Sequence, residues 1–295
     1  MADQNTDHAL ARAGPTVTRV VETVAETAPD VRGGLAGRRM YDPDADENPS
    51  GEQQLAADLY ADDLLEDRLL AIDGVGGYAS EEREEMSLAD DEGYHVACDP
   101  LDGSSNLKSN NAMGTIFGVY DAALPAAGDH LVAAGYVLYG PITTMALAVE
   151  GHASEYVVAD GDLELDTADL SLPDDAVVYG FGGRVPDWPD DFAAYVDGVE
   201  DELKLRYGGA MIADVNQVVT YGGVFAYPAL SSAPNGKLRL VFEGAPIAYV
   251  IEAAGGASSD GGRSLLAVEA EELHQRVPVH VGSTGYIERL EAALD

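Results

Sequence analysis

Residue types that can bind both a cation and a phosphate come together in the segment Asp99–Asn106, which reads Asp-Pro-Leu-Asp-Gly-Ser-Ser-Asn. Asp99 and Asp102 follow an apolar stretch, so both carboxylates are expected just beyond the end of one strand. The small residues after them let backbone N–H groups approach a ligand, and a helix that begins there would offer an anion site. These are the groups that metal-assisted phosphoryl transfer needs. The same residue types also favour an ordinary turn, and composition alone does not decide between the two interpretations.

Two other segments add charged side chains. Glu81-Glu82 lies on a predicted glycine-flanked loop, where an acidic pair in so acidic a chain is by itself typical of solvated surface. The segment Lys237–Glu243 is predicted to be a strand, in which side chains alternate between the two faces. Leu238, Leu240 and Phe242 then share one face, and Lys237, Arg239 and Glu243 share the other. The charged face is either an ion-pair ladder on a solvated sheet or part of a phosphate and metal site.

All the candidate metal ligands carry oxygen donors. None of the 6 histidines shows the spacing of a metal-ligand pair. Oxygen ligands alone favour Mg²⁺, with Mn²⁺ as the alternative, over zinc.

The charge of the chain restricts its partners and surroundings. Asp and Glu number 53 against 16 Lys and Arg, for a formal net charge of −37. A nucleic-acid partner is excluded, because binding phosphate backbones requires clustered Lys and Arg. An acidic surface along the whole chain indicates adaptation to a salt-rich cytoplasm. Cys98 is the single cysteine, and there is neither a signal-peptide pattern nor an apolar run of ~20 residues, so a cytoplasmic protein without a membrane segment is expected.

Hydrophobic periodicity predicts the elements that must position these residues. Helices are expected at about 17–33, 55–73, 189–199, 209–219, 246–254 and 286–294, with an exposed loop at 41–51. Strands are expected at 95–98, 115–120, 131–138, 146–150, 155–158, 176–180 and 237–242. Their interleaving predicts an α/β or layered α+β fold. The polar segment 159–175 is the expected boundary between an N-terminal metal-site domain, residues 1–170, and a C-terminal sugar-phosphate domain, residues 171–295.

Together these motifs resemble class 1 fructose-1,6-bisphosphatase. The resemblance runs in order from about residue 40 to 257 and is carried by residues 80–82, 98–106, 114–120, 206–207, 221–228 and 237–256. It implies an αβαβα sandwich and an enzyme of gluconeogenesis. The implied reaction is Mg²⁺-dependent hydrolysis of fructose 1,6-bisphosphate to fructose 6-phosphate and phosphate. It also implies a homo-oligomer, either a dimer or a tetramer.

The resemblance further implies a role for each matching residue. The implied metal ligands are Glu81, Asp99, the Leu101 carbonyl, Asp102 and Glu243. Glu82 resembles the family's general base, with Asp58 as its helper. The substrate-binding residues would be Asp102, Gly103, Ser104, Ser105, Arg206, Tyr207, Met211, Tyr227, Lys237 and Arg239. In this set Gly103, Ser104 and Arg239 hold the 1-phosphate, Tyr207, Tyr227 and Lys237 hold the 6-phosphate, Met211 lies against the sugar, and Arg206 reaches into a neighbouring subunit. Asn48 and Glu52 fall in the family's mobile loop.

Departures from the family pattern leave the substrate open. A family asparagine is replaced near Gly182, in the half that would hold the 6-phosphate. Gly93 replaces a lysine that helps to bind inhibitory AMP in animal members, so weak or absent AMP inhibition is expected. The alternatives are a sedoheptulose-1,7-bisphosphatase, a broader sugar or inositol phosphatase, and a non-catalytic sugar-phosphate sensor. Cys98, Ser104 and Ser105 stand where inositol-monophosphatase-like enzymes usually carry tryptophan and threonines, which disfavours that class.

Overall fold

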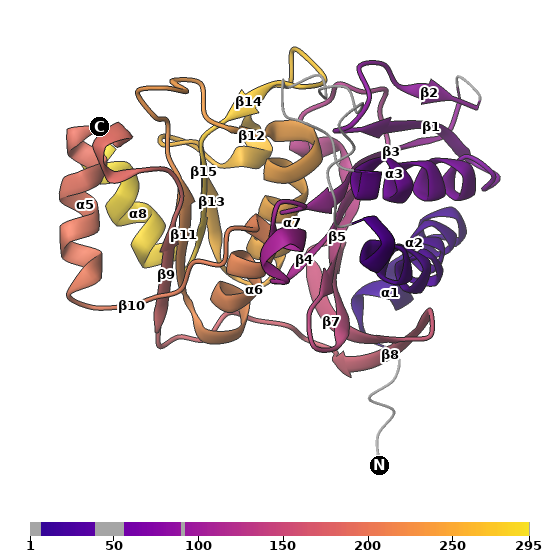
Figure 1. Ribbon diagram of the computed structural model, residues 1–295, viewed down its shortest axis with the longest axis horizontal. Coiled ribbons are helices and arrows are strands. Elements are labelled where there is room, and N and C mark those ends of the chain that lie inside the picture. The colour runs from indigo at the N-terminus through magenta and orange to yellow at the C-terminus, as the bar shows by residue number, and fades with distance from the viewer. Residues whose placement is uncertain (1–6, 39–55, 90–91, 295) are drawn as a thin grey trace.

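Two large β-sheets, one two-stranded sheet and three layers of helices make up the described part of the chain (Figure 1). The computed structural model describes residues 7–38, 56–89 and 92–294. The first sheet has the strand order β2-β1-β3-β4-β5-β6-β7-β8, and the second has the order β10-β9-β11-β15-β13. Asn48, Glu52 and the predicted loop at 41–51 lie outside the described residues. The layered αβαβα sandwich is confirmed.

The strands of the first sheet are β1 (Val75–Ser80), β2 (Ser87–Leu88), β3 (Tyr94–Asp102), β4 (Met113–Tyr120), β5 (Leu131–Tyr139), β6 (Thr143–Val149), β7 (His152–Ala159) and β8 (Asp162–Thr167). The second sheet contains β9 (Val178–Phe181), β10 (Lys204–Leu205), β11 (Gly223–Tyr227), β13 (Ala257–Ser259) and β15 (Val279–Gly282), while β12 (Leu238–Arg239) pairs with β14 (Arg276–Val277). The helices are α1 (Ala9–Arg12), α2 (Pro15–Leu35), α3 (Ala56–Leu69), α4 (Asn106–Ser109), α5 (Asp190–Glu200), α6 (Met211–Tyr221), α7 (Ala245–Ala253) and α8 (Thr284–Leu294).

The burial of each helix explains its layer. Helices α1 to α3 cover the outer face of the first sheet, and α2 buries the valine stripe that begins at Val17 and Val20. Helices α5 and α8 cover the outer face of the second sheet. Helices α6 and α7 lie between the sheets and contact both. Ile247 and Val250 of α7 are fully buried, as expected for a helix enclosed on all sides.

The structure corrects three predicted elements. The expected strand at 237–242 is wrong beyond Arg239, because residues Leu240–Gly244 form a π-helical turn that leads into α7. The glycine-rich stretch before Glu81 is the buried strand β1 rather than a turn. The polar segment 159–175 contains β8, an edge strand whose side chains alternate in burial.

The central apolar core joins the two halves of the chain. It contains Ile116 from the first half together with Phe242 and Val281 from the second. The chain passes from the first sheet to the second between β8 and β9, while the division into residues 1–170 and 171–295 stays a prediction. None of the helices described is both long and apolar enough to cross a lipid bilayer.

Candidate active site

One cleft, enclosing about 190 Å³, gathers the predicted site residues from both halves of the chain. The predicted residues that line it are Asp58, Glu81, Glu82, Asp99, Leu101, Asp102, Gly103, Ser104, Ser105, Tyr207, Met211, Tyr227, Lys237, Arg239 and Glu243. All the predicted catalytic, metal-binding and substrate-binding residues lie in the described part of the chain. Of these, Arg206 alone does not line the cleft. Its side chain is exposed, and Nη1 donates to the Leu205 carbonyl oxygen at 3.2 Å.

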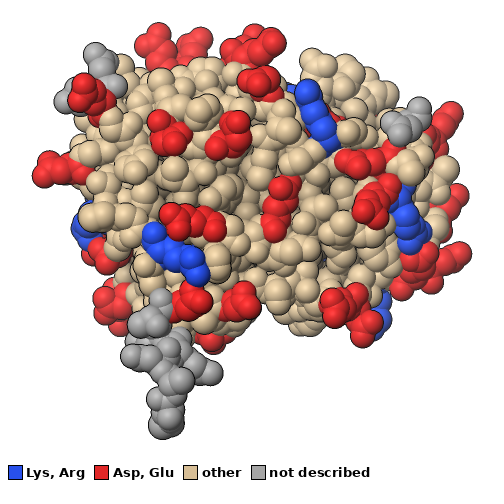
Figure 2. Space-filling model, turned by 180° about the vertical axis from the view of Figure 1, so that it is seen from behind, with Lys and Arg blue, Asp and Glu red and all other residues tan. Residues whose placement is uncertain are grey.

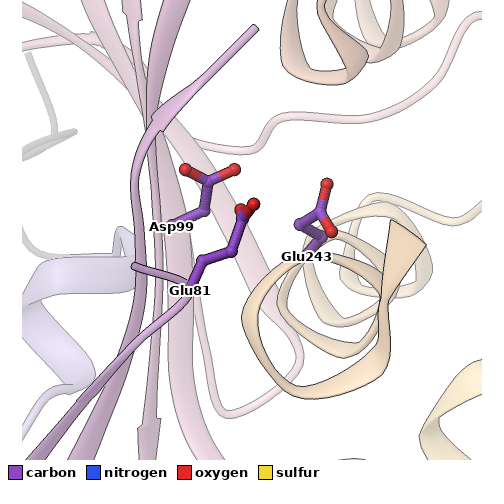
Figure 3. Close-up of side chains that lie close together, drawn as sticks. All are labelled: Glu81, Asp99 and Glu243. Atoms are coloured by element: carbon purple, nitrogen blue, oxygen red, sulfur yellow. The ribbon is translucent and has the colours of Figure 1, made fainter. Parts of the chain in front are cut away.

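The backbone brings three carboxylates together at the centre of the cleft (Figure 3). Strands β1 and β3 are parallel neighbours with Ser80 opposite Cys98, so the next residues, Glu81 and Asp99, come side by side. Glu243 reaches them from the π-helical turn. One oxygen of each carboxylate lies within 4.8 Å of the others, and all three side chains are buried.

The electrostatics of this cluster fit a bound cation. Burial, followed by repulsion from neighbouring carboxylates, raises the pKa of Asp99 and of Glu243 well above their ordinary values. Arg239 offsets part of the repulsion, with Nη2 at 2.9 Å from Glu81 Oε1 and Nη1 at 3.8 Å from Glu243 Oε2. Its backbone N–H also donates to Glu243 Oε2 at 2.6 Å. Buried oxygen donors with excess negative charge suit a hard divalent cation.

Asp102 connects this acidic cluster to the second half of the chain. Its Oδ2 accepts a hydrogen bond of 2.8 Å from the backbone N–H of Ile212, in the first turn of α6. Burial raises the pKa of Asp102 to about 7, while that hydrogen bond acts in the opposite direction. Asp102 is therefore held at the helix N-terminus, where backbone N–H groups lack partners within the helix.

The segment after Asp102 has the tight geometry expected of a phosphate loop. Gly103 has a φ of +74°, and a Cβ there would lie 2.2 Å from the Cβ of Ala210, so only glycine fits. The Ser104 N–H donates to the Leu101 carbonyl oxygen at 3.1 Å. A bound phosphate would have to share or replace that bond. The helix that follows, α4, has 4 residues.

Sequence reasoning missed two residues that hold the loop before α6. Asp214 accepts hydrogen bonds from the N–H groups of Gly208 at 2.6 Å and Gly209 at 3.3 Å, and burial raises its pKa to about 6. Asn106 donates from Nδ2 to the Gly208 carbonyl oxygen at 2.9 Å. This loop follows Tyr207, and Asp214 and Gly209 also line the cleft. No sequence signal marks the Asn106 contact, because Asn106 and Gly208 lie far apart along the chain.

The two substituted glycines have steric explanations. A Cβ at Gly182 would lie 2.2 Å from Cδ2 of the Tyr227 ring, so the ring occupies the space that a side chain would take. Gly93 has a φ of +118°, and a Cβ there would lie 2.5 Å from the Gly74 carbonyl oxygen. Neither position accepts a larger residue without movement of its neighbours.

Comparison with known proteins agrees with this geometry along nearly the whole chain. Residues 35–165 match the model of the N-terminal domain of fructose-1-6-bisphosphatase, and residues 172–295 match that of its C-terminal domain. The class 1 fructose-1,6-bisphosphatase of Natronomonas pharaonis is 68% identical over 277 residues, which span 93% of this chain and 97% of the relative. The chain belongs to the class 1 fructose-1,6-bisphosphatase family.

Other members of the fructose-1,6-bisphosphatase family support the fold and the salt adaptation. The Haloarcula marismortui relative is 53% identical over 98% of both chains. The solved holo structure of Leishmania major fructose-1,6-bisphosphatase matches with a TM-score of 0.89 at 28% identity, covering 95% of each chain. The acidic composition fits the relatives from halophilic archaea. Dependence on a divalent metal is general in the family, and the cluster of Glu81, Asp99 and Glu243 could bind such an ion.

Proposed function

We propose that this fructose-1,6-bisphosphatase family member removes the 1-phosphate of fructose 1,6-bisphosphate with Mg²⁺ in its acidic site, and that Mn²⁺ can replace Mg²⁺. The observation that carries the proposal is the meeting of Glu81, Asp99 and Glu243 in a cleft that also contains Arg239 and Lys237. Bound Mg²⁺ would neutralise phosphate charge and lower the pKa of a water molecule. The Leu101 carbonyl and Asp102 complete the proposed ligand set.

Glu82 is the proposed general base. It follows Glu81 directly and lines the cleft, and its backbone N–H donates to Ser80 Oγ at 3.1 Å. Glu82 accepts a proton from the attacking water, whose oxygen bonds to phosphorus as the bond to the sugar oxygen O1 breaks on the opposite side. The departing O1 takes up a proton from solvent and leaves as the hydroxyl of fructose 6-phosphate. Asp58 of α3 lines the same cleft and is the proposed helper that orients Glu82 or the water.

The cations and aromatic hydroxyls of the cleft are assigned to the two phosphates. The 1-phosphate would meet Gly103, Ser104 and Ser105. It would also meet Arg239, whose guanidinium pairs with Glu81 at 2.9 Å and would become available if that carboxylate bound a cation. Lys237 would bind the 6-phosphate as a point charge, beside Tyr207 and Tyr227. The remaining proposed contacts are Met211 with the sugar and Arg206 with a neighbouring subunit of a cytoplasmic dimer or tetramer.

Phosphate release from three substrates tests this proposal. The wild-type protein is assayed with Mg²⁺ on fructose 1,6-bisphosphate, sedoheptulose 1,7-bisphosphate and inositol 1-phosphate, at low and at high KCl. We expect turnover of the first substrate to exceed that of the third by at least ~100-fold, since a monophosphate leaves Lys237 without a partner phosphate. Comparable or faster turnover of the sedoheptulose substrate would favour the alternative enzyme, and the absence of any turnover would overturn the enzymatic assignment.

Regulation by AMP is proposed to be weak or absent. The backbone at Gly93 leaves no room for the lysine that helps to bind AMP in animal members. Inhibition of the wild-type protein by micromolar AMP would contradict this.

A further inference from the structure

A second polar cluster lies behind the candidate metal site, on the face of the first sheet that α3 covers. Asp62 of α3 is 1% exposed, and its Oδ1 accepts a hydrogen bond of 2.9 Å from the Tyr78 hydroxyl. Its Oδ2 accepts a short hydrogen bond from Nε of Arg83. Successive side chains on a strand point to opposite faces, so Tyr78 and Ser80 of β1 point toward α3 while Glu81 enters the cleft.

This cluster is attached to the turn that carries Glu81 and Glu82. Ser80 Oγ accepts the backbone N–H of Glu82 at 3.1 Å, and the Arg83 N–H donates to the Ser80 carbonyl oxygen at 3.2 Å. The Arg83 carbonyl oxygen in turn accepts a hydrogen bond of 2.7 Å from His274 Nε2. Asp62 therefore reaches the turn through the side chain of Arg83.

Ser80 provides the second connection between Asp62 and the turn. Burial raises the pKa of Asp62, and the side chains of Ser80, Arg83 and Tyr78 act against this shift by stabilising the ionised carboxylate. The Ser80 hydroxyl thus interacts with Asp62 on one side and with the Glu82 backbone on the other.

Arg83 has two further carboxylate partners, and both are more exposed than Asp62. Asp63 is paired with Arg83 Nη2 at 2.9 Å and is 72% exposed, and Glu66 is paired at 2.8 Å and is 18% exposed. Exposed ion pairs contribute little because solvent screens them. A buried carboxylate with fixed hydrogen-bond partners defines the position of the guanidinium far more strictly.

We propose that Asp62 is a positioning residue for this reaction: it holds Arg83 and Ser80, and through them it fixes Glu82 for proton transfer and Glu81 for metal binding. The inference rests on the proposed roles of Glu81 and Glu82 and adds a residue outside the cleft. A base displaced by ~1 Å can cost ~10²-fold in rate. Loss of the Asp62 charge leaves the partly buried Arg83 paired only with more exposed carboxylates.

The test compares Asp62→Asn with the matched variant Asp63→Asn. The amide introduced by Asp62→Asn keeps the size of the side chain and still accepts from Tyr78, but it cannot accept from Arg83 as a carboxylate does. We expect kcat for fructose 1,6-bisphosphate to fall by ~10- to 100-fold with KM changed by less than ~2-fold. We also expect the Kd for Mn²⁺, measured by electron paramagnetic resonance of free Mn²⁺, to rise several-fold. Asp63→Asn should stay within ~2-fold of wild type in all three quantities.

A double-mutant cycle separates positioning from general destabilisation. If Asp62 acts through Arg83, then Asp62→Asn combined with Arg83→Gln has a kcat no lower than that of the worse single variant. All rates are expressed per folded molecule, with folding followed by circular dichroism. A variant that lowers only Tm, with wild-type kcat per folded molecule and wild-type Mn²⁺ affinity, would overturn the proposal. Should Asp62→Asn fail to fold, Ser80→Ala removes the hydroxyl that connects Asp62 with the Glu82 backbone. That variant is judged by the same two measurements, kcat per folded molecule and Mn²⁺ affinity.

Failure of the proposed base can be distinguished from failure of this inference. Glu82→Gln is assayed in parallel, and retained turnover there would reject Glu82 as the base. The Mn²⁺ affinity of Asp62→Asn still decides whether Asp62 positions the turn, because it depends on Glu81 rather than on Glu82.

Discussion

At the scale of the residue, the site is a set of buried like charges that the fold only partly compensates. Arg239 contacts Glu81 and Glu243, yet the pKa values of Asp99 and Glu243 remain raised by burial and mutual repulsion. Such an arrangement stores repulsion that a bound divalent cation would relieve. Stability without metal and affinity for metal should therefore change in opposite directions when one charge is removed.

Asp99→Asn tests whether stability without metal rises while affinity for metal falls. The amide keeps the size of the side chain and can still accept from the Leu101 N–H, which donates to Asp99 Oδ1 at 2.9 Å. We expect Tm in EDTA to rise by about 2–4 °C, since one repulsive charge is lost. The Mg²⁺-induced rise in Tm and the turnover should both largely disappear. The exposed Asp67→Asn is the control, and full Mg²⁺ stabilisation of Asp99→Asn would contradict the metal assignment.

His280 gives a pH dependence that is separate from the site. It is fully buried in β15, its Nδ1 lies 3.0 Å from the Ser259 carbonyl oxygen, and burial lowers its pKa to about 4. Between pH ~6.5 and that value the unfolded chain binds a proton that the folded chain does not, so stability falls as pH falls, by about 3 kcal/mol in total. In urea unfolding, His280→Gln should show a flatter pH dependence across this window. An unchanged slope would show that His280 does not titrate on unfolding.

At the scale of the element, the sequence located the site better than it assigned the structure around it. The valine stripe from Val17 predicted α2 because few other structures bury side chains at that spacing. The strand expected at 237–242 ends at Arg239, where the π-helical turn begins, yet Arg239 and Glu243 still face the same site. A separation of four residues suits both the period of a strand and that of a helical turn, so the pattern could not distinguish them.

Other features depend on contacts that no local pattern contains. At Gly77 in strand β1 there is little room for a side chain, because a Cβ would lie 3.1 Å from Met86 Sδ and 3.2 Å from Leu88 Cδ2 of the neighbouring strand. Asn106 binds the loop after Tyr207 only once the two halves are packed together, whereas Asp214 binds the same loop from the helix that follows it. The sequence could give the candidate residues from both halves of the chain, whereas the contact that Asn106 makes across the two halves required the fold.

Loss of packing under the π-helical turn should weaken Mg²⁺ binding at the site, whereas the same loss in an outer helix layer should not. Phe242 and Phe192 are both fully buried, Phe242 in the turn that carries Glu243 and Phe192 in the outer layer of α5. Truncation of either to Ala should destabilise the protein by about 3–5 kcal/mol. Among folded molecules, only Phe242→Ala should raise the Mg²⁺ concentration required for half-maximal turnover. Equal Mg²⁺ dependence in the two variants would show that the turn does not set the position of Glu243.

At the scale of the whole molecule, the net negative charge is expected to control how stability depends on salt. Acidic side chains are scattered over the whole visible face in Figure 2, whereas basic ones are few and separate. The formal charge of −37 makes the folded chain repel itself, and the repulsion is strongest where salt does not screen it. Raising KCl from 0.1 M to 1 M shortens the Debye length from ~10 Å to ~3 Å, so the folded state should gain stability over that range.

A charge variant separates this screening from other effects of salt. Four exposed acidic residues are suitable for this variant: Asp67, Glu164, Asp197 and Glu288. Replacing all four by the corresponding amides reduces the net negative charge, from −37 to −33. We expect the variant to have a higher Tm than wild type at 0.1 M KCl and a smaller rise in Tm on going to 1 M, because less repulsion is left to screen. Scanning calorimetry at both concentrations measures this. A salt-induced rise as large as in wild type would mean that KCl stabilises the protein through exclusion from its surface or through bound ions, and not by screening its net charge.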